Sequence, residues 1–351
     1  MNVAVVGCGN ISLPYARSIL AAPQLELFGA TDAVPGRADA LVAEVGGASY
    51  PSVDALLADP RVDLVVNLTP ARAHAAVTRA GLEAGKHVYS EKPLALTYEE
   101  ARELVELAAE RGVRLGCAPS TLLGEAQQTA WKLVRDGAIG RVRVVYADAN
   151  WGRIESWHPA PLTLYAVGPA VDVGVYPLTM ATAMFGPAEH VVAYATTVEP
   201  ERTARDGSSF RSEAPDFVVA ALDLAGGVVV RLTASFYVGP SKQRGLEFHG
   251  DRGSLHLPTW GEANSRVELQ ERGGEYAPVP LVRPPFEGID WSRAIVDLAE
   301  AVEEGRPHRA HGTQAAHVVE ILCAIAASSS NGAPVAIASR FEPPPPMEWA
   351  Q

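Results

Sequence analysis

Two short stretches of this sequence carry residue types suited to moving protons beside a bound molecule. Ser90-Glu91-Lys92-Pro93 ends an apolar run, which predicts a lysine at the carboxyl end of a strand. Asp172 and Tyr176 are four residues apart, so an acid and a phenol share one face if their segment is helical. Alternatively, such a lysine is a solvated strand end and such a pair is a helix-surface contact. The residues alone leave both interpretations open.

A glycine-rich string near the N-terminus predicts a dinucleotide site. Gly7-Cys8-Gly9-Asn10-Ile11-Ser12 follows the apolar run 3–6 and precedes a helical pattern. The first glycine permits a tight turn, the second lets the backbone approach a pyrophosphate, and the helix N-terminus favours the negative charge. Ser12 stands in place of the usual third glycine and is still small enough for close packing. Alternatively, the string is an ordinary strand–turn–helix connection.

The second predicted strand ends in a carboxylate that bears on cofactor choice. Asp32 lies at the spacing where an acid accepts hydrogen bonds from the adenosine ribose hydroxyls. We therefore expect NAD, because a 2′-phosphate beside this carboxylate would be repelled. Arg37 leaves NADP possible, since a nearby arginine can accommodate the 2′-phosphate.

Composition excludes several other classes of protein. The chain has 29 Lys and Arg against 41 Asp and Glu, and this net charge of −12 argues against a nucleic-acid partner. Cys8, Cys117 and Cys323 are far apart and odd in number, which predicts reduced thiols and a cytoplasmic location. There is no basic leader and no apolar run of about 18 residues, so neither export nor a membrane span is expected. The histidines and cysteines form no metal-binding string, and no metal is expected.

The elements that must position these residues follow two different patterns. The first third of the chain alternates β-branched runs with helical stretches, which is typical of βαβ units with a parallel sheet. Helix starts are expected near 52–57 and at Thr97, where the spacing to Glu100 fits a capping box. We therefore predict an α/β Rossmann domain over residues 1–120, with strands at 3–6, 25–31, 62–68, 87–90 and 113–117.

After Gly140 the runs alternate like half-exposed strands joined by glycine-rich turns. Turns at 225–227 and 250–253 predict two hairpins. Two helices are expected at 290–304 and 313–328. Pro343–Pro346 predict a solvated tail. The second domain, 121–351, is therefore expected to be α+β, with an open, mainly antiparallel sheet that serves substrate binding and oligomerisation. The strands expected in it are 141–151, 216–224, 228–237 and 246–249.

Taken together, these landmarks resemble the Gfo/Idh/MocA family of oxidoreductases over nearly the whole chain. The landmarks also include 67–70 with His74 and the segment 136–140 before the sheet domain. The resemblance implies hydride transfer between NAD(P) and a secondary alcohol of a sugar, sugar derivative or cyclitol. It implies cofactor contacts from Gly7, Gly9, Asn10, Ile11, Asp32, Arg37, Thr69, Pro70, His74, Glu91 and Lys92.

The resemblance also implies which residues act on the substrate. It assigns catalysis to Lys92, Asp172 and Tyr176, with the lysine near the nicotinamide. Tyr176 stands where a histidine is usual, and a tyrosine with an ordinary pKa near 10 needs a neighbouring cation to exchange a proton. The implied substrate contacts are Lys92, Arg153, Trp157, Asp172 and Tyr176.

One departure from the family pattern and one segment rich in aromatic residues bear on substrate choice. Residues 117–123 replace a usual Asn-Arg-Phe segment, which predicts a different substrate preference. Trp151, Arg153, Trp157 and His158 lie where relatives build the cofactor and sugar pocket. A tryptophan face suits the C–H surface of a sugar, although its commoner role is packing.

Three functions remain as alternatives. The first is a dehydrogenase or reductase with exchangeable cofactor, and the second is a glycosidase or lyase that uses bound NAD transiently. These two differ in whether NADH accumulates. The third is a catalytically silent nucleotide-binding regulator, against which the presence of both Lys92 and Asp172 argues. In each case we expect a homodimer or homotetramer formed through the exposed sheet, because an uncovered apolar face is costly in water.

Overall fold

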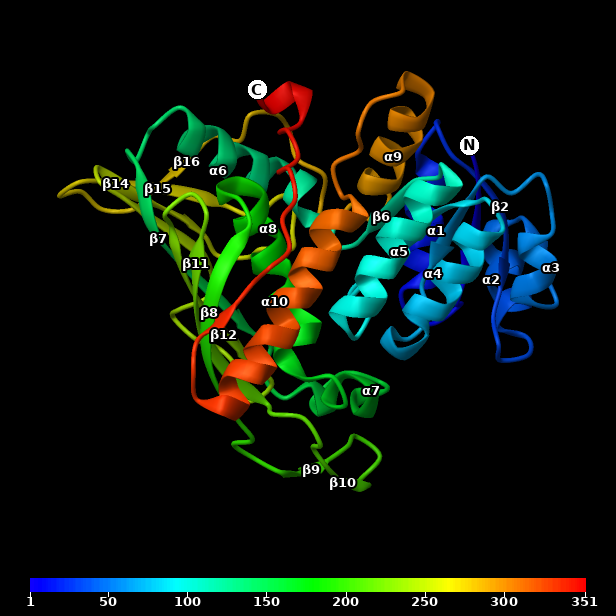
Figure 1. Ribbon diagram of the computed structural model, residues 1–351, viewed down its shortest axis with the longest axis horizontal. Helices are drawn as coiled ribbons and strands as arrows, with labels where there is room; N and C mark the ends of the chain where they lie inside the picture. The colour runs from blue at the N-terminus through cyan, green and yellow to red at the C-terminus, as the bar shows by residue number, and fades with distance from the viewer. The chain divides into compact units, whose positions relative to one another are not determined.

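The computed structural model describes residues 1–351 and divides into two compact units (Figure 1). The first contains Met1–Ser120 and Asp290–Val319, and the second contains Thr121–Ile289 and Glu320–Gln351. The sequence predicted a single domain boundary, near residue 120, which placed residues 290–319 in the second domain. That segment instead returns to the first unit. Helix α9 (Arg293–Glu304) packs on strand β6 (Leu115–Cys117), and the N–H of Cys117 donates to the carbonyl of Ala310 at 2.9 Å.

The first unit is built on a six-stranded parallel sheet in the order β3-β2-β1-β4-β5-β6. All five predicted strands are present with small shifts at their ends, and only the short β3 was not predicted. The order reverses between β1 and β4, where α/β sheets of this kind form a ligand crevice at the carboxyl ends of the strands. The strands are β1 (Asn2–Val6), β2 (Glu26–Thr31), β3 (Ala48–Ser49), β4 (Leu64–Asn67), β5 (His87–Ser90) and β6.

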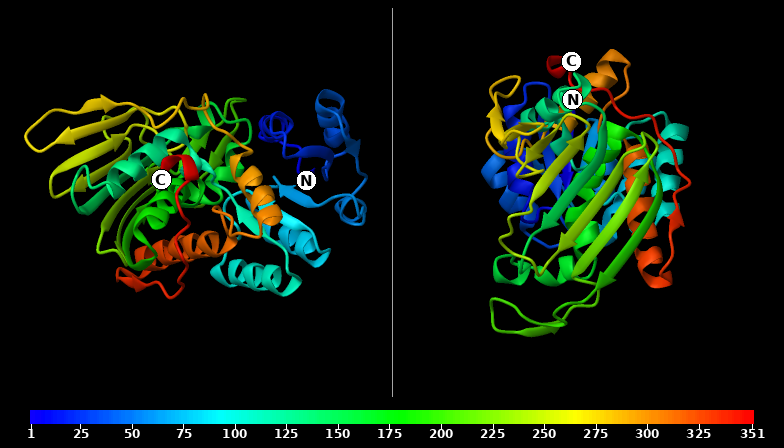
Figure 2. Two further views of the ribbon diagram at one scale, coloured as in Figure 1. Left: turned by 90° about the horizontal axis from the view of Figure 1, so that it is seen from above. Right: turned by 90° about the vertical axis from the view of Figure 1, so that its left-hand side faces the viewer.

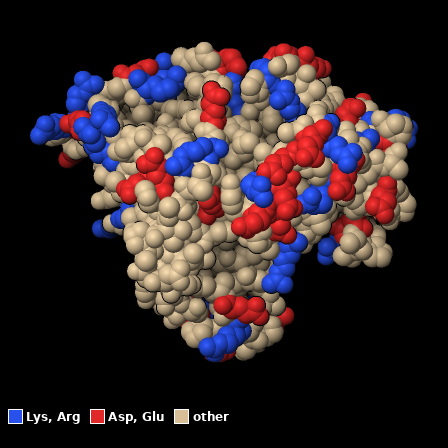
Figure 3. All heavy atoms as spheres, viewed as in Figure 1, with Lys and Arg blue, Asp and Glu red and all other residues tan.

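The connecting helices begin where the sequence offers caps. The hydroxyl of Thr97 accepts the N–H of Glu100 at 3.3 Å, and that of Ser52 accepts the N–H of Ala55 at 3.1 Å. Acidic side chains gather over helix α5 on the face that Figure 3 shows. No helix of the structure combines the length and apolar character needed to cross a bilayer. The helices of this part are α1 (Ser12–Ala21), α2 (Arg37–Val45), α3 (Val53–Leu57), η1 (Ala71–Ala73), α4 (His74–Glu83) and α5 (Tyr98–Arg111).

The second unit is built on a nine-stranded sheet in the order β16-β15-β14-β13-β7-β12-β11-β8-β17. Both predicted hairpins are present, as the antiparallel pairs β11–β12 and β13–β14. Strands β7 and β12 pair in parallel, so the sheet is mainly but not wholly antiparallel. Its strands are β7 (Val142–Asn150), β8 (Ala188–Thr196), β11 (Phe217–Leu224), β12 (Val229–Ser235), β13 (Gly245–Gly250), β14 (Gly253–Leu257), β15 (Val267–Glu271), β16 (Ala277–Val279) and β17 (Val335–Ala336).

Helices cover only one face of this sheet. Helices α6 (Glu125–Arg135) and α8 (Val175–Phe185) pack on it, and Ser328 of α10 (Gly312–Asn331) accepts the N–H of Ala193 in β8. No helix of this unit lies over the opposite face, which the strands present side by side (Figure 2, right). The predicted open sheet is therefore present.

The prediction of a solvated proline tail was wrong in part. Pro344 is buried, and the N–H of Met347 donates to the side chain of Gln128 on α6 at 2.8 Å. The guanidinium of Arg283 lies 3.8 Å from the ring centroid of Trp349. The residues after the prolines thus anchor the tail to its own unit.

Asp297 on α9 anchors the segment that returns to the first unit. Its carboxylate accepts the N–H of Arg309 at 2.6 Å and Nη1 of Arg306 at 2.9 Å, and it pairs with the buried guanidinium of Arg309. We predict that Asp297→Ala lowers the free energy of unfolding by about 3–5 kcal/mol, because it leaves a buried cation without its carboxylate. Urea denaturation measures this loss.

Glu300→Ala is the matched control on the same helix. Glu300 lies 3.7 Å from Arg306 and 37% of its side chain is exposed, and such surface pairs contribute at most about 1 kcal/mol. Equal losses in the two variants would show that Asp297 is not a buried anchor.

Candidate active site

The glycine-rich loop after β1 has the shape that a pyrophosphate requires. Gly7 has a φ of +98°, and a Cβ there would lie 2.8 Å from the backbone of Leu68 and Thr69. A side chain is therefore excluded, and the loop lies directly against the end of β4. A Cβ at Gly9 would meet no atom within 4 Å, so the backbone is open to a ligand. The loop fits the dinucleotide predicted from its sequence.

Asp32 at the end of β2 is fixed against this loop. One carboxylate oxygen accepts the N–H of Cys8 at 2.6 Å, and the other accepts the N–H of Val34 at 2.7 Å. Arg37 lies 4.0 Å from the carboxylate with 54% of its side chain exposed. Burial and the neighbouring Asp32 raise the pKa of Cys8 to about 11, so its thiol stays protonated at neutral pH.

Two further loops at the same sheet edge are joined by His74. Its ring nitrogens lie 2.6 Å from the carbonyl oxygen of Thr69 and 2.7 Å from that of Pro93. Burial lowers the pKa of this histidine. Asn67 adds a second link, accepting the hydroxyl of Thr69 at 2.6 Å and donating to the carbonyl of His74 at 3.0 Å. Both polar atoms of the histidine ring are thus engaged by protein carbonyls, while Thr69 and Pro70 remain at the surface of the loop.

The backbone of Lys92 is held by the carboxylate that precedes it. Glu91 is buried, accepts the phenol of Tyr15 at 2.7 Å and accepts the N–H of Lys92 at 3.0 Å. Its own N–H donates to the carbonyl of Asn67 at 2.8 Å. Lys92 therefore follows β5 at the sheet edge that also carries Gly7, Asp32 and Thr69. Tyr15 was missed by sequence reasoning, because no motif relates it to Glu91.

In the second unit, Asp172 and Tyr176 lie on consecutive helical turns. Asp172 is buried in the π-helical turn η4 (Ala170–Gly174), and the half-buried Tyr176 is in the first turn of α8. The predicted helical character is present, but a π-turn has wider i→i+5 spacing. The two side chains are therefore not one regular α-helical turn apart. Val173 in the same turn is fully buried in a cluster that includes Phe236.

An aromatic residue that sequence reasoning missed lies against Tyr176. The ring of Trp260 is 4.5 Å from that of Tyr176, centroid to centroid, with an interplanar angle of 30°. Trp260 also contacts Trp151 at 6.2 Å, and Trp151 contacts Trp157 at 5.3 Å. Only Trp151 and Trp157 were expected, because they precede Asp172 closely in the chain while Trp260 follows it at long range.

Arg153 is occupied by carboxylates of its own unit. It pairs with Glu199, lies 3.8 Å from Glu155, and its guanidinium is 4.9 Å from the ring centroid of Tyr237. Since 46% of its side chain is exposed, the arginine still borders solvent. His158 accepts the N–H of Ala160 at 3.0 Å and lies close to Trp157.

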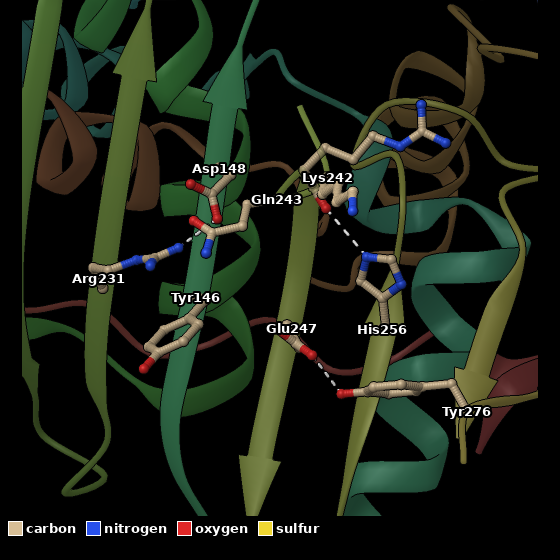
Figure 4. Close-up of a pocket in the computed structure, with 10 residues that line it drawn as sticks. Tyr146, Asp148, Arg231, Lys242, Gln243, Glu247, His256 and Tyr276 are labelled. Atoms are coloured by element: carbon tan, nitrogen blue, oxygen red, sulfur yellow. Dashed lines mark hydrogen bonds and ion pairs between the residues drawn. The ribbon is translucent and has the colours of Figure 1, made fainter. Parts of the chain in front are cut away.

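A separate polar pocket of about 280 Å³ lies on the uncovered face of the sheet. Arg231 and Asp148 point toward one another from neighbouring strands, 2.5 Å apart, and the phenol of Tyr276 donates to Glu247 (Figure 4). Burial raises the pKa of Asp148. None of the predicted site residues lines this pocket, whose polar groups largely pair with one another.

Comparisons with known proteins decide the family. Residues 1–118 match the model described as an oxidoreductase family with an NAD-binding Rossmann fold, and residues 127–256 match the Gfo/Idh/MocA C-terminal domain. The chain belongs to the Gfo/Idh/MocA family. The resemblance drawn from its motifs is confirmed, and this enzyme is an NAD-binding oxidoreductase.

Relatives and a solved structure align with most of the chain. The UDP-N-acetylglucosamine 3-dehydrogenase of Acidithiobacillus ferrooxidans is 28% identical over 88% of this chain and 90% of its own. The inositol 2-dehydrogenase of Rhizobium meliloti is 23% identical over 86% and 87%. A levoglucosan dehydrogenase solved with NADH and L-sorbose has a TM-score of 0.85 at 22% identity, covering 97% of this chain and 99% of its own. This structural match supports the fold described above.

The fixed carboxylate of Asp32 predicts a preference for NAD over NADP. A 2′-phosphate beside it loses hydrogen bonds and is repelled, at a cost of about 1–3 kcal/mol, which corresponds to roughly tenfold to a hundredfold in affinity. Calorimetric titration with both dinucleotides measures the difference. Asp32→Ser is expected to narrow it.

Asp39→Ser, an exposed carboxylate in the first turn of α2, is the control and is expected to leave the preference unchanged. Tighter binding of NADP by the unaltered enzyme would contradict this prediction. It would identify Arg37 as a phosphate ligand instead.

Proposed function

We propose that this enzyme transfers a hydride reversibly between C4 of the nicotinamide and a secondary carbinol of a sugar, sugar derivative or cyclitol. The main support is that buried Glu91 fixes the backbone of Lys92 at the same sheet edge as the glycine-rich loop. Relatives named for a sugar nucleotide and an inositol support the substrate class. When bound, the cofactor supplies the hydride acceptor or donor, and the protein binds, orients and exchanges the proton.

The proposed cofactor contacts follow the loops of the first unit. Backbone groups of the glycine loop hold the pyrophosphate, and Asp32 accepts the ribose hydroxyls. His74 acts by holding two loops in place, because both its ring nitrogens face protein carbonyls. The residues proposed to contact or support the cofactor are Gly7, Gly9, Asn10, Ile11, Asp32, Arg37, Thr69, Pro70, His74, Glu91 and Lys92.

Lys92, Asp172 and Tyr176 are proposed to act on the substrate hydroxyl. The ammonium of Lys92 donates a hydrogen bond to the reacting oxygen and stabilises negative charge on it. Tyr176 exchanges the proton, which requires a cation nearby, since the ordinary pKa of a tyrosine is near 10. Asp172 accepts a hydrogen bond from the substrate or from the lysine. Arg153 and Trp157 are proposed as further substrate contacts.

A panel of polyols, aldoses and inositols, assayed with NAD by absorbance, tests the activity. We expect NADH to accumulate with at least one of them. Turnover of a glycoside without NADH accumulation would favour the glycosidase or lyase alternative. Tight NAD binding with no turnover would favour the silent regulator.

If Tyr176 carries the proton, Tyr176→Phe is predicted to lower turnover about 10²–10⁴-fold, the usual contribution of general acid–base catalysis. The affinity for NAD should be nearly unchanged. Lys92→Ala should be at least as damaging, because the lysine contributes both a hydrogen bond and the positive field. Steady-state kinetics on the best substrate of the panel measure both effects.

The double variant tests whether the two groups act together. Residues that act as a unit are strongly non-additive, so Lys92→Ala with Tyr176→Phe should be far less impaired than the product of the single effects. Near-normal turnover of Tyr176→Phe would leave Lys92 as the acid–base group and make Tyr176 a packing residue.

We also propose a cytoplasmic location. All three cysteines are free thiols, and Cys8 and Cys117 are buried. Unpaired thiols persist where cellular reductants keep them reduced.

The uncovered sheet face is proposed to form a homodimer or homotetramer. Val192, Tyr194, Val229 and Tyr146 place partly exposed apolar side chains on this face, between 37% and 62% exposed. They belong to adjacent strands, since β8, β11, β12 and β7 pair in order. Burial against a second copy removes this apolar surface from water.

Light scattering at micromolar concentration is therefore predicted to give at least twice the mass of one chain. Val192→Arg with Tyr194→Arg should shift the protein toward the monomer, because two charges would enter the contact. Leu20→Arg, at a position equally exposed on α1, is the control and should leave the mass unchanged. A monomeric unaltered protein would exclude the proposed assembly.

A further inference from the structure

Four aromatic rings of the second unit form a continuous series, which we call the aromatic row: Tyr176, Trp260, Trp151 and Trp157. Successive ring centroids are 4.5, 6.2 and 5.3 Å apart. These separations are within the range of direct ring contact. The row begins at the proposed proton carrier and continues away from it through three tryptophans. One six-membered sugar ring has about the footprint of one tryptophan, so the row is longer than a monosaccharide needs.

The far end of the row is unusually open to solvent. Trp151 is 41% exposed and Trp157 is 43% exposed, although tryptophan is a residue that proteins mostly bury. Trp260, in contrast, packs against a core cluster that contains Ile154, Val173 and Phe236. Trp260 is therefore held by the core, while the indole rings of Trp151 and Trp157 are partly exposed to solvent.

A buried ionic network holds the segment that carries Trp151 and Trp157. Glu155, in η3 (Ile154–Ser156), accepts Nη1 of Arg202 at 2.9 Å and the phenol of Tyr165 at 2.5 Å. Arg202, in β9 (Glu201–Thr203), is fully buried and also pairs with the buried Asp216. The guanidinium thus ties the tryptophan segment to the sheet. Surfaces fixed before binding lose less conformational entropy when a ligand arrives.

The charges around this segment disfavour an anionic ligand. Two guanidinium groups, of Arg153 and Arg202, face three carboxylates, of Glu155, Glu199 and Asp216. The local balance is therefore negative, and the exposed Arg153 already pairs with Glu199. A phosphate or diphosphate beside Trp157 would meet this excess of carboxylates.

We propose that the aromatic row is a binding subsite for an uncharged glycoside, in which a second ring lies on Trp151 and Trp157 while the ring to be oxidised lies at Tyr176 and Trp260. The second ring is a sugar presenting its C–H face or an aromatic aglycone, since both complement an indole surface. This inference rests on the proposed function for the placement of the reacting ring. It deepens that function by naming the substrate class.

Calorimetry with the NAD-bound enzyme compares matched ligands. The pairs are glucose with cellobiose and phenyl β-D-glucoside, galactose with lactose and phenyl β-D-galactoside, and myo-inositol with galactinol. UDP-glucose serves as the charged comparison. In at least one set we expect the two-ring ligand to bind about tenfold or more tightly than its one-ring parent, and more tightly than UDP-glucose. The disaccharide and phenyl arms distinguish a sugar from an aromatic second ring.

Trp157→Ala is expected to remove this advantage, so that the two-ring ligand binds no more tightly than its one-ring parent does to the same variant. Trp157→Phe keeps an aromatic ring and should retain most of the advantage. Trp349→Ala, in the C-terminal segment of the same unit and held against Arg283, is the control and should behave as the unaltered enzyme. Circular dichroism melting shows that each variant is folded.

Three results would overturn the subsite: equal affinity for one-ring and two-ring ligands in every set, tightest binding of UDP-glucose, or an advantage that survives Trp157→Ala. Absence of binding by every two-ring ligand also counts against it. The measurement is independent of turnover. Glycoside binding without NADH formation in the activity panel would contradict the proposed function alone, and NADH formation without a two-ring advantage would contradict the subsite alone.

Discussion

The first unit depends on one buried carboxylate. A carboxylate removed from water is costly unless hydrogen-bond donors replace the solvent, and Glu91 obtains two such donors, the phenol of Tyr15 and the N–H of Lys92. Tyr15 lies on α1, the helix that begins at the glycine loop, while Lys92 follows β5. One side chain therefore fixes the cofactor helix relative to the lysine. The ring of Tyr15 also packs against Trp291, which extends the same contact to the segment that returns after residue 289.

Local patterns were sufficient to predict most of the fold. The parallel strands are buried apolar runs, and the hairpins at 225–227 and 250–253 are marked by glycine, so short windows of sequence identify them. Strand β8 was missed because its sequence shows no clean alternation of apolar and polar residues. Strand β15 does alternate, but over only five residues, and was also missed. The parallel pairing of β7 with β12 and the return of α9 to β6 depend on contacts far apart in the chain. No local pattern specifies such contacts.

The candidate site likewise contains residues that the sequence predicted and residues that it did not. Lys92 and Asp172 stand in short strings that the family resemblance identifies, although the residues alone left a solvated strand end and a helix-surface contact as alternatives. The residues that support the site have no such signal, because Tyr15 reaches Glu91 and Trp260 reaches Tyr176 across long stretches of chain. Arg153 shows a different limit of prediction from sequence. Its position predicted a substrate contact, yet the structure pairs it with Glu199, so residue type and position did not reveal how the charge is used locally.

The π-turn beside Tyr176 has a physical reason in the sequence. Pro177 follows Tyr176 and has no N–H, so the carbonyl of residue 173 lacks the i+4 donor that an α-helix would provide. An α-helical turn is therefore less favoured here, and the chain instead forms the wider turn η4 before α8 begins. Leu232 and Ala234 of β12 lie close to Gly174, which limits how far this turn can relax. The irregular backbone thus arises from Pro177, the residue adjacent to the proposed proton carrier. Such π-turns are frequently found at functional sites.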